Sequence, residues 1–157
     1  MGGSDEKNKA LNRMRGLCSR REYAKGDIKK KLERYKSLTN EEIFDILSSL
    51  EEDNYINNAR FALAFARDKS GIDGWGEVKI SYALSLKGVF TDDIKNALAQ
   101  LDKPKAETKL EKLVLNKKKL LVGDPNIRMK LIKYLISRGY PYEKSKEITD
   151  KCLRGNS

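Results

Sequence analysis

The sequence predicts an all-α protein made of three tandem three-helix repeats that form an elongated, curved array. Apolar residues recur every four positions and lead to a glycine or a lysine, as in a helix that closes on a C-terminal cap. The pattern occurs three times, at Ile28, Leu32 and Lys36, at Ile80, Leu84 and Gly88, and at Leu131, Leu135 and Gly139. Only 3 prolines occur, and no long stretch alternates apolar with polar residues, so helix is favoured over strand.

The spacing of these copies defines the predicted domains. Ile80 follows Ile28 by 52 positions, and Leu131 follows Ile80 by 51. A period of this length is typical of repeat architectures. The expected repeats span residues 5–52, 53–104 and 105–153. A unit of about fifty residues buries too little apolar surface to be stable alone, so neighbouring copies are expected to pack face to face.

The first repeat is expected to begin with a helix over residues 5–17. Ser19 and Thr39 each precede a helical run with early acidic residues, as N-capping and the helix dipole favour. One residue is inserted after Lys36, which makes this turn different from the turns of the other copies. The buried face of the third helix is then formed by Ile43, Ile46, Leu47 and Leu50.

The second repeat is expected to open with a helix over residues 58–69, in which FALAFA is interpreted as part of a buried helix. The glycine-rich segment SGIDGWG, residues 70–76, predicts a loop before the second helix. Thr91 is expected to start the third helix. Its apolar face contains Ile94, Ala97, Leu98 and Leu101.

The third repeat is expected to start with a helix over residues 105–119, because Pro104 can begin a helix but cannot continue one. The segment VGDPN, residues 122–126, predicts the next loop. Ile148 and Cys152 belong to the buried face of the last helix. Ser145 occupies a position on that face where an apolar residue is expected.

The composition restricts the classes of function. Lysine and arginine number 33 against 23 acidic residues, which gives a net charge of +10. This excess favours a polyanionic partner, although it also keeps a small helical protein in solution. No histidine is present, which removes the commonest general base and a zinc site. Cys18 and Cys152 are interpreted as small buried residues. We therefore expect a cytoplasmic, monomeric, non-catalytic protein without a metal or cofactor.

The basic residues supply the candidate binding site. Lys79 matches Lys130 across copies, and Lys87 matches Arg138. The last two also suit the helix dipole at a C-terminal turn, whereas a cation in a first turn is better explained by an external anion. The only tryptophan, Trp75, lies in a loop, where it either stacks on a base or packs onto its own domain. The candidates are Arg20, Arg21, Lys29, Lys30, Arg67, Trp75, Lys79, Lys87, Lys117, Lys118, Arg128, Lys130, Lys133 and Arg138.

Several segments resemble the RecX family of regulators of the RecA recombinase. They are CSRREYAKGDIKKKL at 18–32, YINNARFA at 55–62, WGEVKISYALSLKGV at 75–89 and DPNIRMKLIKYLISRGY at 124–140. The middle repeat is the most specific. The chain departs from the family at Asn58, where an acidic residue is usual, and at Lys36, which replaces a small turn residue.

The resemblance implies a non-catalytic protein that binds RecA filaments on single-stranded DNA and lowers filament extension, strand exchange and coprotease activity. The candidate residues would then contact RecA or DNA. Two alternatives remain open from the residues themselves. One is a general single-stranded nucleic-acid-binding module, which a steep salt dependence without RecA would favour. The other is a helix-turn-helix transcription factor, which would bind duplex DNA sequence-selectively.

Overall fold

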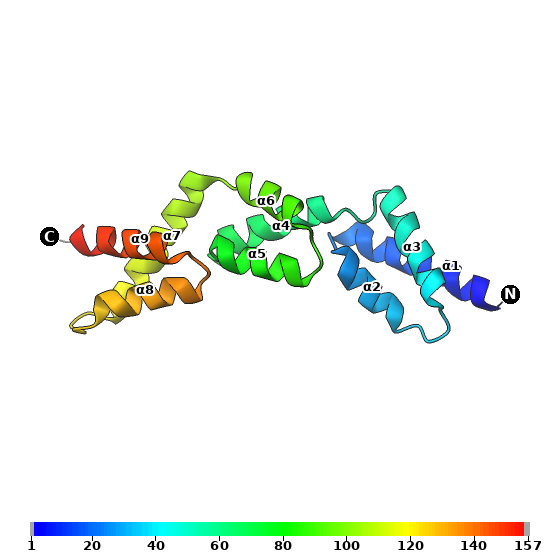
Figure 1. Cartoon of the computed structure of the whole chain (residues 1–157), viewed down its shortest axis with the longest axis horizontal. Helices are drawn as coiled ribbons and strands as arrows, with labels where there is room; N and C mark the ends of the chain where they lie inside the picture. Colours follow the sequence, from blue (N-terminus) through cyan, green and yellow to red (C-terminus); the bar gives the residue numbers. More distant parts are fainter. Residues whose placement is uncertain (1, 156–157) are drawn as a thin grey trace. The chain divides into compact units, whose positions relative to one another are not determined.

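The computed structural model describes residues 2–155 of the chain, and over this range it contains nine α-helices and no strand (Figure 1). The predicted all-α fold class is therefore confirmed. The helices are α1 (Gly2–Arg20), α2 (Lys25–Glu33), α3 (Asn40–Glu52), α4 (Asn58–Gly71), α5 (Glu77–Leu86), α6 (Thr91–Ala99), α7 (Lys103–Leu120), α8 (Ile127–Ser137) and α9 (Tyr142–Arg154). Among the described helices, none has the length and apolar character needed to cross a bilayer.

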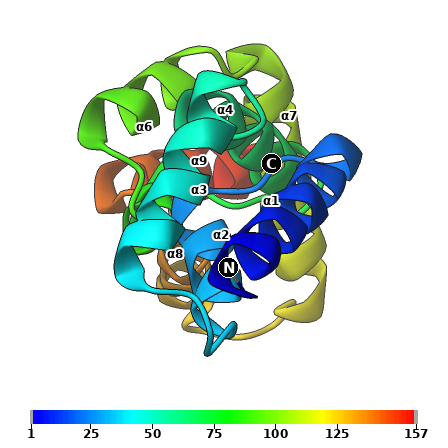
Figure 2. The ribbon, with the colours of Figure 1, turned by 90° about the vertical axis from the view of Figure 1, so that its right-hand side faces the viewer.

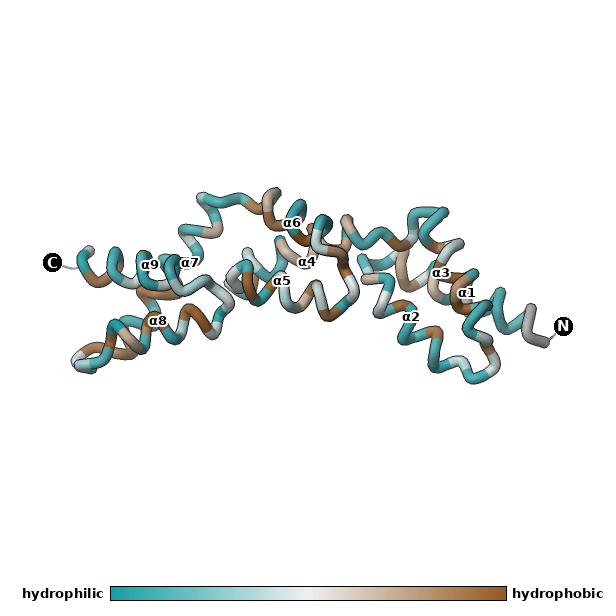
Figure 3. Tube along the Cα trace, in the orientation of Figure 1, coloured by the Kyte–Doolittle hydropathy of each residue, from teal (hydrophilic) through white to brown (hydrophobic). Residues whose placement is uncertain are grey.

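The opening helix of each predicted repeat is present as α1, α4 and α7, with ends within about three residues of those expected, a normal scatter for helix boundaries. Hydrophobic and hydrophilic segments alternate along the Cα trace (Figure 3), as expected for helices with one buried side. Contacts divide the chain into two compact units. One contains the chain up to Ala64 together with Leu84–Ala97, and the other contains Phe65–Ala83 and the chain from Leu98 onward. The three repeat boundaries and the elongated array stay predictions.

In the first unit, α3 packs against both α1 and α2 (Figures 1 and 2). The two apolar residues that mark the repeat in α2, Ile28 and Leu32, are both fully buried. The other buried residues of this core are Ala10, Met14, Cys18, Leu38, Ile43, Ile46, Leu47, Leu50 and Ile56. The predicted apolar face of the third helix is thus confirmed.

The start of α3 follows the prediction, but the start of α2 does not. The Thr39 hydroxyl accepts a hydrogen bond from the Glu42 N–H, and the Glu42 carboxylate accepts one from the Thr39 N–H, which forms a capping box. Ser19 instead lies inside α1, where its hydroxyl donates to the Arg15 carbonyl at 2.8 Å. The prediction that Ser19 caps the next helix is wrong, because α1 continues to Arg20 and Ala24 precedes α2 without a side-chain cap.

In the second unit, α7, α8 and α9 pack against one another (Figure 1). The fully or almost fully buried residues of their shared core are Leu110, Val114, Leu131, Leu135, Ile148 and Cys152. Ser145 is also fully buried, and its hydroxyl donates to the Tyr140 carbonyl at 3.4 Å. A serine therefore fills the position where the repeat pattern predicts an apolar side chain.

The glycine caps predicted after the second helix of two repeats are present. Gly88 and Gly139 have φ angles of +81° and +98°, in the left-handed region that favours glycine. The next residue in each case, Val89 or Tyr140, donates its N–H to a carbonyl five positions earlier in the helix, as in a Schellman motif. In the first repeat, α2 ends at Glu33, and its C-cap residue Arg34 has a φ of −74°. This turn, which the sequence left open, therefore differs from the other two.

Candidate functional site

Lys87, at the C-terminal turn of α5, contacts the first turn of α2. Its ammonium group pairs with the Asp27 carboxylate at 2.8 Å and lies 5.8 Å from the centre of the Phe61 ring. The two backbones approach closely, since a Cβ added to Gly26 would lie 2.9 Å from the Lys87 carbonyl oxygen. This candidate binding residue thus has a partner within its own unit and serves to join two helices.

Arg138, the matching residue after α8, forms a second joint with the loop that leads into α5 and with the first turn of that helix. Its guanidinium donates to the Asp73 carbonyl. Its carbonyl accepts from the Gly76 N–H at 2.8 Å, and the Gly139 carbonyl accepts from the Val78 N–H at 2.9 Å. The Arg138 side chain is half-buried, and its Nε has no hydrogen-bond partner among the described residues. The basic residue before each glycine cap therefore faces a neighbouring element of the same unit.

Trp75 and Lys79 are brought together beside this second joint. The Lys79 and Lys69 ammonium nitrogens lie 4.4 and 4.8 Å from the centre of the Trp75 indole ring, within cation–π range. The Phe65 ring meets the indole edge-on, with centroids 6.2 Å apart. The half-buried Trp75 thus packs onto its own domain, which is one of the two interpretations offered by the sequence, and base stacking stays a prediction.

Two candidate cations of α8 are paired with carboxylates. Arg128 donates to both oxygens of Asp150, at 2.7 and 3.2 Å, and this bond lowers the pKa of the Asp150 carboxyl and raises that of Arg128. Lys130 pairs with Asp124, whose pKa is lowered by hydrogen bonds from Lys130 and from the Asn126 N–H. The charges of each pair cancel within the protein. Exposed ion pairs of this kind are weak, however, so their cations can pair with an external anion instead.

Two further candidates lie on α7 and also contact the protein. The Lys117 ammonium lies 5.1 Å from the centre of the Tyr134 ring. Lys118 donates to the Cys152 carbonyl at 3.0 Å, where it supplies a cation to a carbonyl in the last turn of α9. Both side chains are half-buried, so these lysines bind helices of the C-terminal group.

The remaining candidates expose their charges to solvent. Arg21 is exposed and lies over the Tyr23 ring, 4.3 Å from its centre. The others, to which the structure assigns no ion pair within the described residues, are Arg20, Lys29, Lys30, Arg67 and Lys133. These side chains retain uncompensated charge for an external anion.

Arg67 belongs to a larger basic feature in the second unit. It lines a groove of about 640 Å³ together with Lys105, Lys109 and Lys112 of α7. These three lysines follow one another at helical spacing and so lie on one face of α7. We call this feature, defined by Arg67, Lys105, Lys109 and Lys112, the α4/α7 groove. Its three lysines are not among the residues predicted from the sequence, although their helical spacing is visible in the segment KPKAETKLEK.

The electrostatics of the α4/α7 groove favour an anion. Four cations line it against one carboxylate, that of Asp102. The Asp102 carboxylate is already engaged, because it caps α7 by accepting the Lys105 N–H at 3.0 Å. No ion pair is formed by the four cations in the described part of the chain. Like charges gathered along a concave surface raise the local concentration of polyanions.

The described residues contain no group of three or more potential metal ligands from histidine, cysteine, aspartate and glutamate. Cys18 and Cys152 are buried as expected, and burial raises the pKa of both thiols, which lowers their reactivity.

Comparison with known proteins gives consistent matches. Residues 57–98 match the model of the second three-helix domain of RecX. A regulatory protein RecX from Prosthecochloris aestuarii is 31% identical over 154 residues, which cover 98% of this chain and 99% of the relative. Another, from Clostridium botulinum, is 28% identical and covers 94% of this chain and 75% of its own length.

Solved structures share the fold. A crystal structure of a regulatory protein RecX superposes with a TM-score of 0.82 at 24% identity, covering 95% of this chain and 74% of that one. The crystal structure of RecX from Lactobacillus salivarius gives a TM-score of 0.78 at 19% identity and covers 97% of each chain.

Proposed function

Because this chain belongs to the RecX family, we propose that it is a non-catalytic regulator that binds RecA filaments on single-stranded DNA. Binding inhibits filament extension and lowers recombinase and coprotease activity in DNA repair and the SOS response. The protein acts in the cytoplasm as a monomer and needs no cofactor.

The observation that carries this proposal, beyond the family, is the uncompensated charge of the α4/α7 groove. A nucleoprotein filament presents acidic protein surface and DNA phosphates, and both attract such a groove. Cations that are not paired within the protein lose no internal contact when they bind. The interaction therefore gains electrostatic attraction without breaking an existing ion pair.

Within this proposal we give most weight to the exposed candidates, and we add the three lysines of the α4/α7 groove. The exposed candidates are Arg20, Arg21, Lys29, Lys30, Arg67 and Lys133. Lys87 and Arg138 receive the least weight, because each is engaged in a joint between helices. Changing either would disturb folding and binding together.

The test challenges RecA-coated single-stranded DNA with the protein while filament length and ATP hydrolysis are followed. In the variant Lys105→Glu/Lys112→Glu, two groove charges are reversed. The matched control Lys95→Glu/Lys146→Glu reverses two exposed lysines on α6 and α9 that do not line the groove. We expect the groove variant to need at least about tenfold more protein for half-inhibition, since buried or focused charge contacts are worth more than isolated surface ones.

Circular dichroism verifies that both variants fold as the parent does. Equal inhibition by the groove variant and the parent would remove the groove from the proposal. Failure of the parent itself to alter filament length or ATP hydrolysis would remove the proposed function.

A general single-stranded nucleic-acid-binding module is the second candidate. The same uncompensated cations favour it, because they attract phosphates whether or not RecA is present. Tight binding to bare oligonucleotide, with affinity that falls steeply as salt rises and no added preference for RecA-coated strands, would support this candidate instead.

A further inference from the structure

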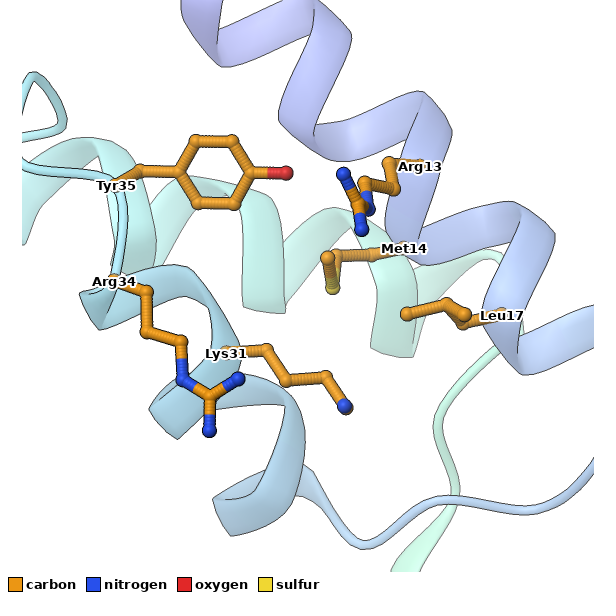
Figure 4. A pocket seen from close by; sticks show the side chains of 6 residues that line it. All are labelled: Arg13, Met14, Leu17, Lys31, Arg34 and Tyr35. Carbon is orange, nitrogen blue, oxygen red and sulfur yellow. The ribbon is translucent and has the colours of Figure 1, made fainter.

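A second cationic cavity lies in the first unit. It occupies about 280 Å³ between α1 and α2 and is lined by Arg13, Met14, Leu17, Lys31, Arg34 and Tyr35 (Figure 4). We call it the α1/α2 cavity. Its volume lies just below the usual range of small-molecule sites, about 300–1,000 Å³, so it suits a ligand of modest size.

The charges of this cavity have one sign. Arg13, Lys31 and Arg34 contribute three cations, and no carboxylate lines the cavity. Within the described residues, the structure assigns none of the three an ion pair, although Lys31 lies 5.7 Å from the centre of the Tyr23 ring. Arg13 and Arg34 are exposed, so their guanidinium groups can take up an anion without losing an internal bond.

The helix dipole explains only part of this cluster. Lys31 and Arg34 lie in the last turn and at the C-cap of α2, where cations are favourable. Arg13, however, comes from the interior of α1, and the dipole of α2 does not account for it. Three like charges from two helices around one cavity repel one another, and an anion placed among them removes that repulsion.

The rest of the lining is apolar and aromatic. Met14 is buried, Leu17 and Tyr35 are half-buried, and all three contribute to the wall. Figure 4 shows Met14 and Leu17 pointing from α1 toward α2, with the Tyr35 hydroxyl directed toward Arg13. A ligand that matches this lining carries an anionic group for the guanidiniums and a flat, largely apolar body for the side chains beneath them.

We propose that the α1/α2 cavity binds a nucleoside phosphate, with the phosphate between Arg13 and Arg34 and the base against Tyr35, Met14 and Leu17. Planar guanidinium groups form bidentate bonds with phosphate oxygens, and aromatic and apolar side chains accept a base by stacking. The ligand is either a free nucleotide or one nucleotide of a single strand. This site does not depend on the proposed regulation of RecA.

Two binding measurements distinguish a free nucleotide from a nucleotide of a single strand. Fluorescence anisotropy of a labelled ATP reports the free nucleotide, and that of a labelled oligo(dT) reports the strand, each with the whole purified chain. Binding of either probe, or of both, supports the site if the affinity falls roughly tenfold or more in Arg13→Gln/Arg34→Gln. A loss of this size is expected when charge-assisted hydrogen bonds are removed. Lys95→Gln/Lys146→Gln is the charge-matched control. It should change affinity by less than about twofold, because neither lysine lines the cavity.

A further variant tests the aromatic wall. Tyr35→Leu should weaken nucleotide binding while leaving competition by inorganic phosphate unchanged, because phosphate contacts only the cations. Three outcomes would overturn the proposal: no binding in either arm, equal binding by the parent and Arg13→Gln/Arg34→Gln, or equal losses in that variant and the lysine control. The last outcome would indicate general surface electrostatics.

Discussion

Replacement of Gly139 by alanine tests the joint between α8 and α5. A Cβ at this position would lie 2.3 Å from the Lys79 Cβ and 2.8 Å from the Lys79 backbone nitrogen. These atoms belong to the first turn of α5 and cannot rotate away like the end of a side chain. The substitution must therefore displace α5 from the turn that follows α8.

Gly88 provides the matched control, because it follows α5 as Gly139 follows α8. Its φ of +81° is similar to the +98° of Gly139, but nothing lies within 4 Å of its added Cβ. Gly88→Ala should cost only the left-handed backbone strain of a non-glycine residue, about 1–2 kcal/mol. Gly139→Ala adds the cost of overpacking, about 1–3 kcal/mol, so its total is about 2–5 kcal/mol.

Urea unfolding followed by circular dichroism measures both free energies of unfolding. Fluorescence of Trp75, the only tryptophan, reports on the joint itself, and its emission should change in folded Gly139→Ala but not in folded Gly88→Ala. A difference between the two variants below about 0.5 kcal/mol, within the error of such extrapolations, would contradict the close approach described for this joint.

Other predictions concern the N-cap, the thiols and the first joint. Thr39→Ala should lower the free energy of unfolding by about 1 kcal/mol, and an unchanged urea midpoint would show that the capping box contributes nothing. Because burial raises the thiol pKa of Cys18 and Cys152, less thiolate is present at neutral pH. A thiol reagent should label them far more slowly in the native protein than in urea, and equal rates would contradict their burial. A double-mutant cycle with Lys87→Met and Asp27→Asn should give a coupling energy of about 0.2–1 kcal/mol, the range for ion pairs open to solvent. A coupling energy of zero would show that only the backbone contacts stabilise this joint.

Helices and their buried faces were predictable because they depend on local spacing. Ile28, Leu84 and Leu135, each chosen from the four-residue pattern, are all fully buried. The glycine caps are local as well, since a left-handed residue after a helix restricts the choice of amino acid. Ser19 was wrongly predicted to be an N-cap, because a serine near a helix boundary suits the N-cap of the next helix and the last turn of the preceding one almost equally.

The partners of the basic residues were not predictable in the same way. Lys87 pairs with a residue 60 positions away, and Arg138 with one 65 positions away. The sequence showed that both residues recur at one position of the repeat, but recurrence is equally compatible with an external anion and with a contact between repeats. The α4/α7 groove likewise needs the end of α4 beside α7, and no local pattern contains that information.

The α4/α7 groove is not repeated along the chain, and this gives a physical reason for proposing that it binds a partner. Lys87 and Arg138 share one position of the second and third copies, and each contacts a neighbouring element of its own unit. When buried Ala62 and Ala66 of α4 are matched with Leu110 and Val114 of α7, Lys109 falls opposite an aromatic residue of α4 instead of a second lysine.

The cations of the α1/α2 cavity are not repeated either. Matching Ile28 with Ile80 places Lys31 opposite Ala83 and Arg34 opposite Leu86, neither of which is basic. These charges therefore add nothing to a contact that the second copy also makes. A ligand that binds only this part of the chain accounts for them, and loss of nucleotide binding in Arg13→Gln/Arg34→Gln without loss of stability would establish that role.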